Sequence, residues 1–225
     1  VVFGGIMVYS FVVCLENVIV FPSLWPNLLQ YCGTDYDEHT LQGYLGWTMG
    51  AFSLGRGFSA LIINSRPPSR TNMRVAATVC FIFSAAGCAL YVLAWSPLIL
   101  ILSRTLSGLG AGALTLMITA LTSLSSNDTR TSAISQFFVA AALGEIAGPL
   151  LAYATVSVDF DMDLFGHIIH INRLNCVGLW TLTLFALSFV FVCRSIEASA
   201  SPDDEMVEER LSIKLFSPRL IMVFT

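Results

Sequence analysis

The sequence predicts an all-α polytopic membrane protein, built as a bundle of six transmembrane helices. Hydrophobic residues make up 56% of the 225 residues and charged residues only 12%, whereas charged residues are about 25% of a typical soluble domain. The apolar residues come in long blocks, and a helix needs roughly 20 such residues to cross a bilayer. Short polar segments separate the blocks, as expected for connecting loops.

Six blocks are long enough to be spans. They cover residues 1–29, 41–64, 75–95, 97–124, 131–156 and 175–192. Pro22 and Pro26 are expected to bend the end of the first span, because proline lacks the backbone N–H that a helix interior uses. Only Ser96 and Pro97 connect the third span to the fourth, which predicts a tight turn between antiparallel neighbours.

The order of the segments predicts one half of a larger transporter. Residues 1–194 form the six-helix bundle, residues 195–216 an acidic cytosolic linker, and residues 217–225 the start of a seventh helix. Six spans, a polar linker and a new apolar start are typical of a protein made of two bundles. We therefore expect a C-terminal six-helix half of the same chain to be the partner of this bundle, within a lipid bilayer.

The charges of the loops predict the orientation in the membrane. The link after the second span carries only basic charges, whereas the links after the first and fifth spans are mainly acidic. Cytosolic loops carry an excess of lysine and arginine. The N-terminus is therefore expected in the cytosol, with the acidic loops on the opposite side.

The fourth span carries one charge, Arg104, followed by the small residues Gly108, Gly110 and Gly112. A charge at membrane depth is costly and usually faces a partner or an aqueous cavity. Small residues allow another helix to approach closely. We expect the glycines to be a packing face and Arg104 to have a partner elsewhere in the bundle.

Two motifs resemble the major facilitator superfamily. Arg104, Ser107, Gly108, Gly110 and Gly112 resemble its fourth-helix motif, and the segment 144–149, with Gly144, Gly148 and Pro149, resembles its fifth-helix motif. The loop over residues 64–74 keeps basic residues but lacks the glycines and the acid of the family's signature there. The resemblance covers residues 1 to about 194 and implies a twelve-helix transporter fold, of which this is the N-terminal bundle.

Shorter strings narrow the resemblance to one branch. Residues 24–28, 44–47, 53–55 and 142–144 resemble the lysosomal branch that includes the neuronal ceroid lipofuscinosis membrane protein, and vacuolar transporters with an added SPX domain are also similar. This resemblance implies a lysosomal or other endomembrane location.

Glu16, in the middle of the first span, is the leading candidate for proton coupling. A carboxyl group in a low-dielectric environment binds a proton more readily, so it can load and release one. The resemblance adds a precedent, because proton-coupled members often place first-helix acids beside the fourth-helix arginine. We hypothesise that Glu16 and Arg104 approach each other across the cavity. The alternative is an ion pair that only fixes helix packing.

Two further charges, Arg56 and Glu145, leave alternatives open. Arg56 in the second span either lines the cavity and attracts an anion or extends toward the cytosolic interface. Glu145 lies between Gly144 and Gly148, which would form a packing ridge. It is either a second proton or cation site or a neutral acid hydrogen-bonded to a neighbouring helix.

No enzyme or cofactor is indicated. The sequence has no Walker motif and no Ser/His/Asp arrangement, and Gly108-x-Gly110-x-Gly112 follows no strand that could make it a dinucleotide loop. His167 and His170 have a spacing that can hold a metal, but no third ligand is defined, so a solvated loop and no metal are expected. No basic stripe suggests nucleic-acid binding.

The sequence therefore predicts a secondary active transporter that moves a small solute by alternating access, with possible proton coupling. An anion channel-like member of the same fold and a non-transporting membrane scaffold are the alternatives.

Overall fold

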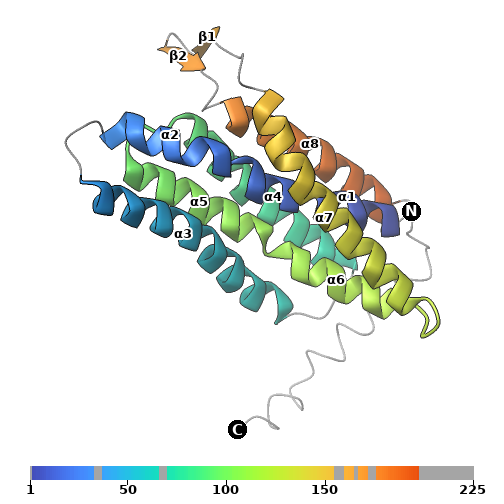
Figure 1. Cartoon of the computed structure of the whole chain (residues 1–225). Helices are drawn as coiled ribbons and strands as arrows, with labels where there is room; N and C mark the ends of the chain where they lie inside the picture. Colours follow the sequence, from blue (N-terminus) through green and yellow to red (C-terminus); the bar gives the residue numbers. More distant parts are fainter. Residues whose placement is uncertain are drawn as a thin grey trace, which may run out of the picture.

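The computed structural model describes residues 2–32, 37–65, 70–154, 160–164, 167–171 and 176–197, which form eight helices and two strands (Figure 1). The helices are α1 (Val2–Ile19), α2 (Phe21–Cys32), α3 (Glu38–Asn64), α4 (Arg70–Val92), α5 (Pro97–Ala111), α6 (Ala113–Leu124), α7 (Arg130–Ala154) and α8 (Cys176–Glu197). The strands are β1 (Phe160–Leu164) and β2 (His167–Ile171).

The eight helices correspond to the six expected spans, since two spans are divided. The first span is α1 followed by α2, and the fourth is α5 followed by α6. Among the described residues, five helical stretches are long and apolar enough to cross a membrane: Phe3–Cys32, Asn72–Val92, Pro97–Ser123, Arg130–Ala154 and Cys176–Ser195. The prediction of an all-α polytopic membrane bundle is confirmed.

Helix α3 is the expected span that does not belong to this apolar set. Its 27 residues would extend about 40 Å at 1.5 Å per residue, which exceeds the thickness of a bilayer core. Its composition is mixed, with Arg56 and several hydroxyl and glycine residues between the apolar ones. Several large apolar side chains of α3 are nevertheless exposed, among them Leu54, Phe58 and Leu61.

Local sequence explains where the divided helices begin. Val20 separates α1 from α2, Pro22 is the second residue of α2, and Pro26 lies inside it. Proline is tolerated in the first turn of a helix, where its missing N–H would have no partner anyway. The side chain of Ser96 accepts a hydrogen bond from the backbone N–H of Leu98, and Pro97 follows it as the first residue of α5. This is the arrangement expected of a helix N-terminus.

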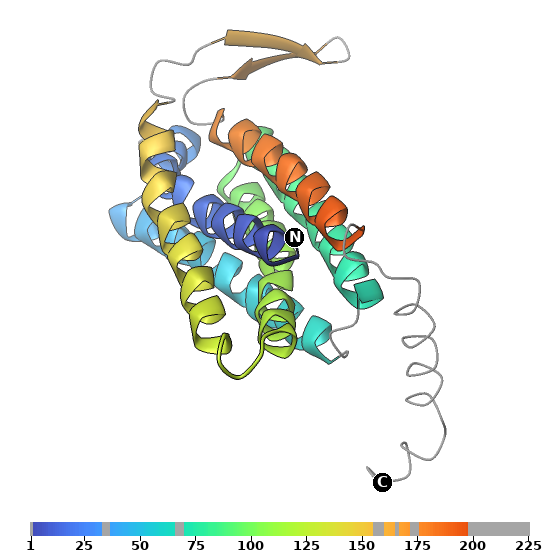
Figure 2. The same ribbon diagram turned by 90° about the vertical axis from the view of Figure 1, so that its right-hand side faces the viewer.

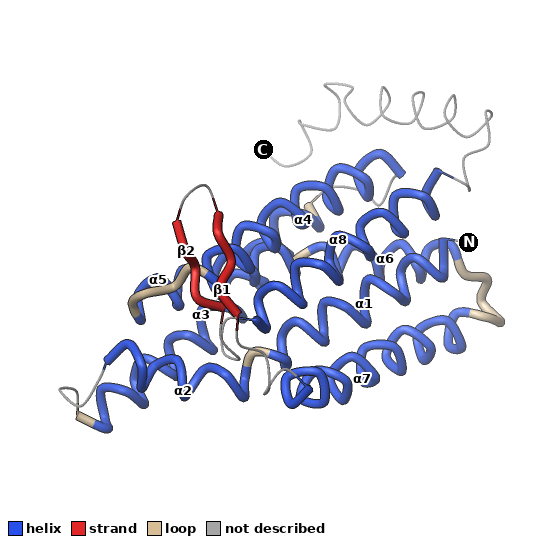
Figure 3. Tube along the Cα trace, turned by 90° about the horizontal axis from the view of Figure 1, so that it is seen from above, coloured by secondary structure: helices blue, strands red, loops and turns tan. Residues whose placement is uncertain are grey.

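Six of the eight described helices pack in two groups of three. Figure 3 shows α1 lying between α7 and α8, and α1 packs against both. In the second group, α5 packs against α3 and α4, while contacts between α4 and α8 join the groups. The two central helices, α1 and α5, carry Glu16 and Arg104 respectively. The fold therefore brings both expected residues into the interior.

The strands are the one departure from helix in the described part of the chain. They form an antiparallel hairpin, in which Phe160 pairs with Ile171 and Leu164 with His167. Figure 2 shows this hairpin beyond the ends of α7 and α8, outside the helical bundle. The expectation of a loop here was wrong in its secondary structure. The linker was expected to begin at residue 195, but α8 continues to Glu197, so its first three residues are helical. The rest of the expected linker, 198–216, and the start of a seventh helix at 217–225 lie outside the described residues.

Candidate functional site

The centre of the bundle holds an ion pair between α1 and α5. Arg104 Nη1 lies 3.9 Å from Glu16 Oε1, and the two side chains are 3% and 1% exposed. The predicted contact between these residues is therefore present. Because the distance is long for an ion pair, the two charges attract each other without forming a close hydrogen-bonded pair.

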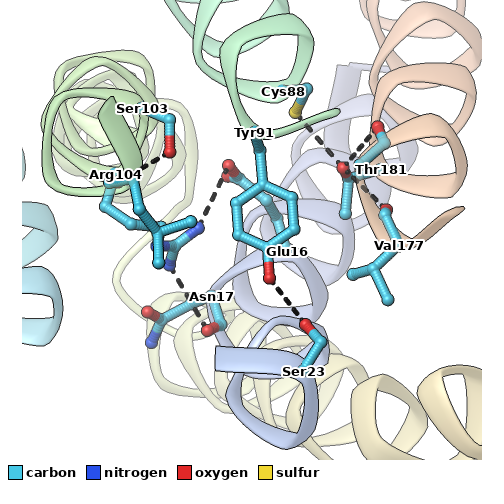
Figure 4. A network of polar contacts seen from close by, with 11 residues as sticks. Glu16, Asn17, Ser23, Cys88, Tyr91, Ser103, Arg104, Val177 and Thr181 are labelled. Atoms are coloured by element: carbon cyan, nitrogen blue, oxygen red, sulfur yellow. Dashed lines mark hydrogen bonds and ion pairs between the residues drawn. The ribbon is translucent and has the colours of Figure 1, made fainter. Parts of the chain in front are cut away.

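Arg104 makes two other contacts that fix its guanidinium group. Its Nη2 donates a hydrogen bond of 3.5 Å to the backbone oxygen of Asn17, and its Cζ lies 4.5 Å from the ring centroid of Phe52. Figure 4 shows the guanidinium turned toward both the Glu16 carboxylate and this backbone oxygen. Arg104 is thus held by one residue of α3 and two consecutive residues of α1.

The pair is incompletely satisfied. Within the described residues, both carboxylate oxygens of Glu16 and Nε of Arg104 lack a hydrogen bond of ordinary geometry. Buried polar atoms are paired in the great majority of cases, and breaking a buried ion pair is strongly destabilising. Ser107 on α5 also lies near the Glu16 carboxylate, so this carboxylate faces two side chains of α5.

The glycines that follow Arg104 lie where α5 meets other helices. A Cβ at Gly108 would collide with the backbone oxygen of Phe52, at Gly110 with the hydroxyl of Ser84, and at Gly112 with that of Ser59. Gly108 therefore packs α5 directly on α3, at the residue whose ring contacts Arg104. Any larger side chain there must move Phe52.

A cavity of about 360 Å³ lies next to the ion pair, between α1, α3 and α6. Its walls are formed by Asn17, Phe52, Ser53, Arg56, Gly57, Ala60 and Thr115. Two of these, Asn17 and Phe52, also contact Arg104. The ion pair is therefore behind the cavity wall and shares that wall with the cavity.

Arg56 is the cationic residue of this wall. It is half-buried and lies on α3, one turn after Phe52. Of the two alternatives left by the sequence, the structure favours a place in the cavity wall. No described residue forms a hydrogen bond or an ion pair with Arg56.

Glu145 is separate from this site. It is exposed on α7, whereas Gly144 and Gly148 on the same helix pack against the backbone of α1 near Phe11 and Ile19. Within the described residues, no hydrogen bond joins Glu145 to a neighbouring helix, and both interpretations of this acid stay predictions. Pro149 lies inside α7 and is exposed.

Sequence reasoning missed a second buried polar cluster, between α2 and α4. Tyr91 Oη lies 2.6 Å from Ser23 Oγ and accepts a hydrogen bond of 3.0 Å from Asn27 Nδ2. Because the Ser23 hydroxyl donates to the Val20 backbone oxygen, Tyr91 is the donor to Ser23. Ser23 and Asn27 are four residues apart on an apolar helix, and this spacing is a signal that could have indicated a shared polar partner.

No resident metal centre is apparent in the described ranges, where no three residues among His, Cys, Asp and Glu come together to hold an ion. His167 and His170 both fall in β2.

These features define a class of protein. A membrane bundle with a polar cavity, and a charged pair buried beside it, is the arrangement of a protein that moves solutes across a bilayer. The family model of the Major Facilitator Superfamily matches residues 6–162, and the chain belongs to this superfamily. The match runs from α1 into β1 and includes Glu16, Arg56, Arg104 and Glu145. Members are generally transporters rather than enzymes. A search of curated proteins finds no match to the chain.

Proposed function

We propose that the chain is the N-terminal bundle of a secondary active transporter, which moves a small solute by alternating access and is driven by protons. A C-terminal bundle of the same chain would complete the solute pathway, as in other transporters built from two repeated halves. The single observation that carries this proposal is the buried pair of Glu16 and Arg104 beside the cavity.

Glu16 is the group that binds the proton. The titratable side chains within electrostatic range of it are Arg104 from α5, Cys88 from α4 and Tyr9 from α1. Of these, arginine is the one that carries a charge near neutral pH. A proton on Glu16 removes the negative charge that faces Arg104, so protonation changes the attraction between α1 and α5.

The change at Glu16 reaches the cavity through two shared residues. Arg104 bonds to the backbone of Asn17 and stacks on Phe52, and both residues line the cavity. When the guanidinium moves, the positions of these two wall residues change with it. Proton binding and solute binding therefore act on the same wall, which is the physical requirement for coupling.

The experiment is uptake into liposomes that contain the full-length protein, with a panel of radiolabelled sugars, amino acids and carboxylates at several external pH values. We expect saturable uptake of at least one solute that rises with an inward proton gradient. The variant Glu16→Gln should retain uptake and lose its pH dependence. Glu145→Gln, which changes an exposed acid on α7, is the matched control and should behave as the parent. Full pH dependence in Glu16→Gln would remove this residue from the coupling role.

Measurements on the same liposomes distinguish the carrier from the two alternative functions, an anion channel and a membrane scaffold. A current that does not saturate and reverses at the equilibrium potential of an anion would replace the carrier by an anion channel. The absence of flux and current for every solute and ion tested would favour a membrane scaffold.

The strings that resemble the lysosomal branch support a proposed location in a lysosomal or other endomembrane, with the N-terminus in the cytosol. Colocalisation of the tagged full-length protein with a lysosomal marker is the test, and labelling of the cell surface alone would contradict it.

A further inference from the structure

We propose that Arg56 is the anchor of a binding site for a small organic monocarboxylate, located in the cavity between α1, α3 and α6. This inference names the solute class for the transporter proposed above and in that respect rests on it. Its geometric basis is independent of proton coupling, because it concerns the arginine that lines the cavity and has no role in the Glu16 pair.

The first argument is that Arg56 has a charge without a partner. It lies at the wall of a space of about 360 Å³, and no described residue neutralises it. An arginine remains charged at any physiological pH, so the charge must be balanced from outside the protein or by water. At membrane depth, where the dielectric constant is low, an anion gains more from such a charge than it does in bulk water.

The second argument is that the two arginines of this region are not equivalent. Arg104 is 3% exposed and is already held by Glu16, Asn17 and Phe52. The Phe52 ring contacts its guanidinium, and Phe52 is also a residue of the cavity wall, which does not include Arg104. A solute in the cavity can therefore contact Arg56 directly, but reaches Arg104 only through the wall.

The third argument concerns the other polar groups that line the cavity. The amide of Asn17 points away from the Glu16 carboxylate in Figure 4 and is a wall residue. Asn17 and Ser53 can donate hydrogen bonds to an anion. Thr115 donates its hydroxyl hydrogen to the backbone oxygen of Gly112, so toward a solute it is an acceptor. Donors lie around Arg56, and one acceptor lies on α6.

These groups select a class of solute. The flat guanidinium matches the two oxygens of a carboxylate. A phosphate that carries two negative charges would need a second cation, and Arg56 is the single cationic residue among the described residues of the wall. The ring of Phe52 and the small residues Gly57 and Ala60 provide an apolar surface for a carbon skeleton, which chloride lacks.

The test measures the electrostatic potential of the cavity from the reactivity of a thiol, so it does not depend on transport. In the full-length protein, Ser53→Cys introduces a thiol on the exposed part of the wall. Its reaction with a negatively charged methanethiosulfonate reagent is compared with its reaction with a positively charged one. The parent protein without this substitution measures the background from native cysteines.

We expect the introduced thiol to react faster with the negative reagent, by about tenfold over the positive one, because a charged cleft concentrates ions of opposite sign. Adding Arg56→Gln should remove this preference, and Arg56→Lys should retain it. Arg130→Gln, which removes an exposed arginine at the start of α7, is the control and should leave the preference unchanged. A preference that is absent, or that survives Arg56→Gln, would overturn the proposal.

The solute class is then tested by protection of the same thiol. L-lactate and acetate should slow its labelling in the parent background and in neither Arg56→Gln nor Arg56→Lys, because lysine keeps the charge without the two-pronged donor. Protection by chloride or phosphate equal to that by both carboxylates would overturn the assignment to carboxylates. Saturable, Glu16-dependent uptake without any charge preference at this thiol would leave the transporter intact and reject the Arg56 site. Protection by the carboxylates without any uptake would support the Arg56 site and reject the transporter.

Discussion

Arg104 and Arg56 are two arginines near one cavity, and they are in opposite circumstances. Arg104 is 3% exposed, faces the Glu16 carboxylate and stacks on the Phe52 ring. Arg56 follows Phe52 by one turn of α3, lines the cavity and has no partner among the described residues. Phe52 contacts the guanidinium of Arg104, and it lines the cavity wall together with Arg56.

The difference separates two tasks that a transporter must connect. A buried arginine with an acidic partner can respond to a proton, whereas a cavity-facing arginine without a partner can respond to a solute. Because one aromatic ring and one backbone segment lie between them, a change on either side alters the same wall. The two sites are distinct in chemistry and linked in structure.

The strongest test of this comparison removes the buried charge. Arg104→Gln leaves the Glu16 carboxyl buried without its partner, which costs about 3–5 kcal/mol when both groups are buried. We expect a large fall in the thermal stability of the detergent-solubilised protein and the loss of uptake. Restoring part of that stability by adding Glu16→Gln would show that the charge left alone is the cause.

Arg130→Gln, at the exposed start of α7, is the matched control and should change stability by less than about 0.5 kcal/mol. If Arg104→Gln is no more destabilising than this control, the two arginines are not in different environments and the comparison fails.

The second test displaces Phe52, the residue that contacts Arg104 and lines the cavity with Arg56. In Gly108→Ala the added methyl group collides with the Phe52 backbone, and overpacking of this kind costs about 1–3 kcal/mol. Gly50→Ala is the control, because a Cβ at Gly50 on α3 meets no other atom within 4 Å. We expect it to be neutral or slightly stabilising, since alanine is the better helix former. Equal stabilities of the two variants, measured by thermal unfolding, would contradict close packing at Gly108.

The sequence was sufficient to predict the bundle and the central pair, for a simple physical reason. Charged residues are rare in apolar spans and costly there, so Glu16 and Arg104 stand out and each requires a partner. The glycines after Arg104 are equally conspicuous, because regularly spaced small residues in an apolar helix have few uses other than close packing.

The other features of the site could not be predicted, because they depend on which helices are neighbours in the fold. The role of Phe52 depends on α3 lying against α5, and one phenylalanine among 16 has no distinguishing local signal. The link of Tyr91 to Ser23 and Asn27 likewise requires α4 to face α2. The hairpin was missed for another reason. Apolar and acidic residues alternate in Phe160–Leu164, a strand period, but the acidic content favoured a loop.

The smallest expected effect on stability, and the sharpest contrast with Arg104, comes from Arg56→Gln. This side chain has no partner to leave unpaired within the described residues, and glutamine preserves most of its length and its helix propensity. We therefore expect a change within about 0.5 kcal/mol, measured by thermal unfolding beside Arg104→Gln. The same variant should lose uptake of the transported anion, because the charge that attracts it is gone. A destabilisation as large as that of Arg104→Gln would mean that Arg56 supports the bundle, and the division of tasks between the two arginines would then have to be abandoned.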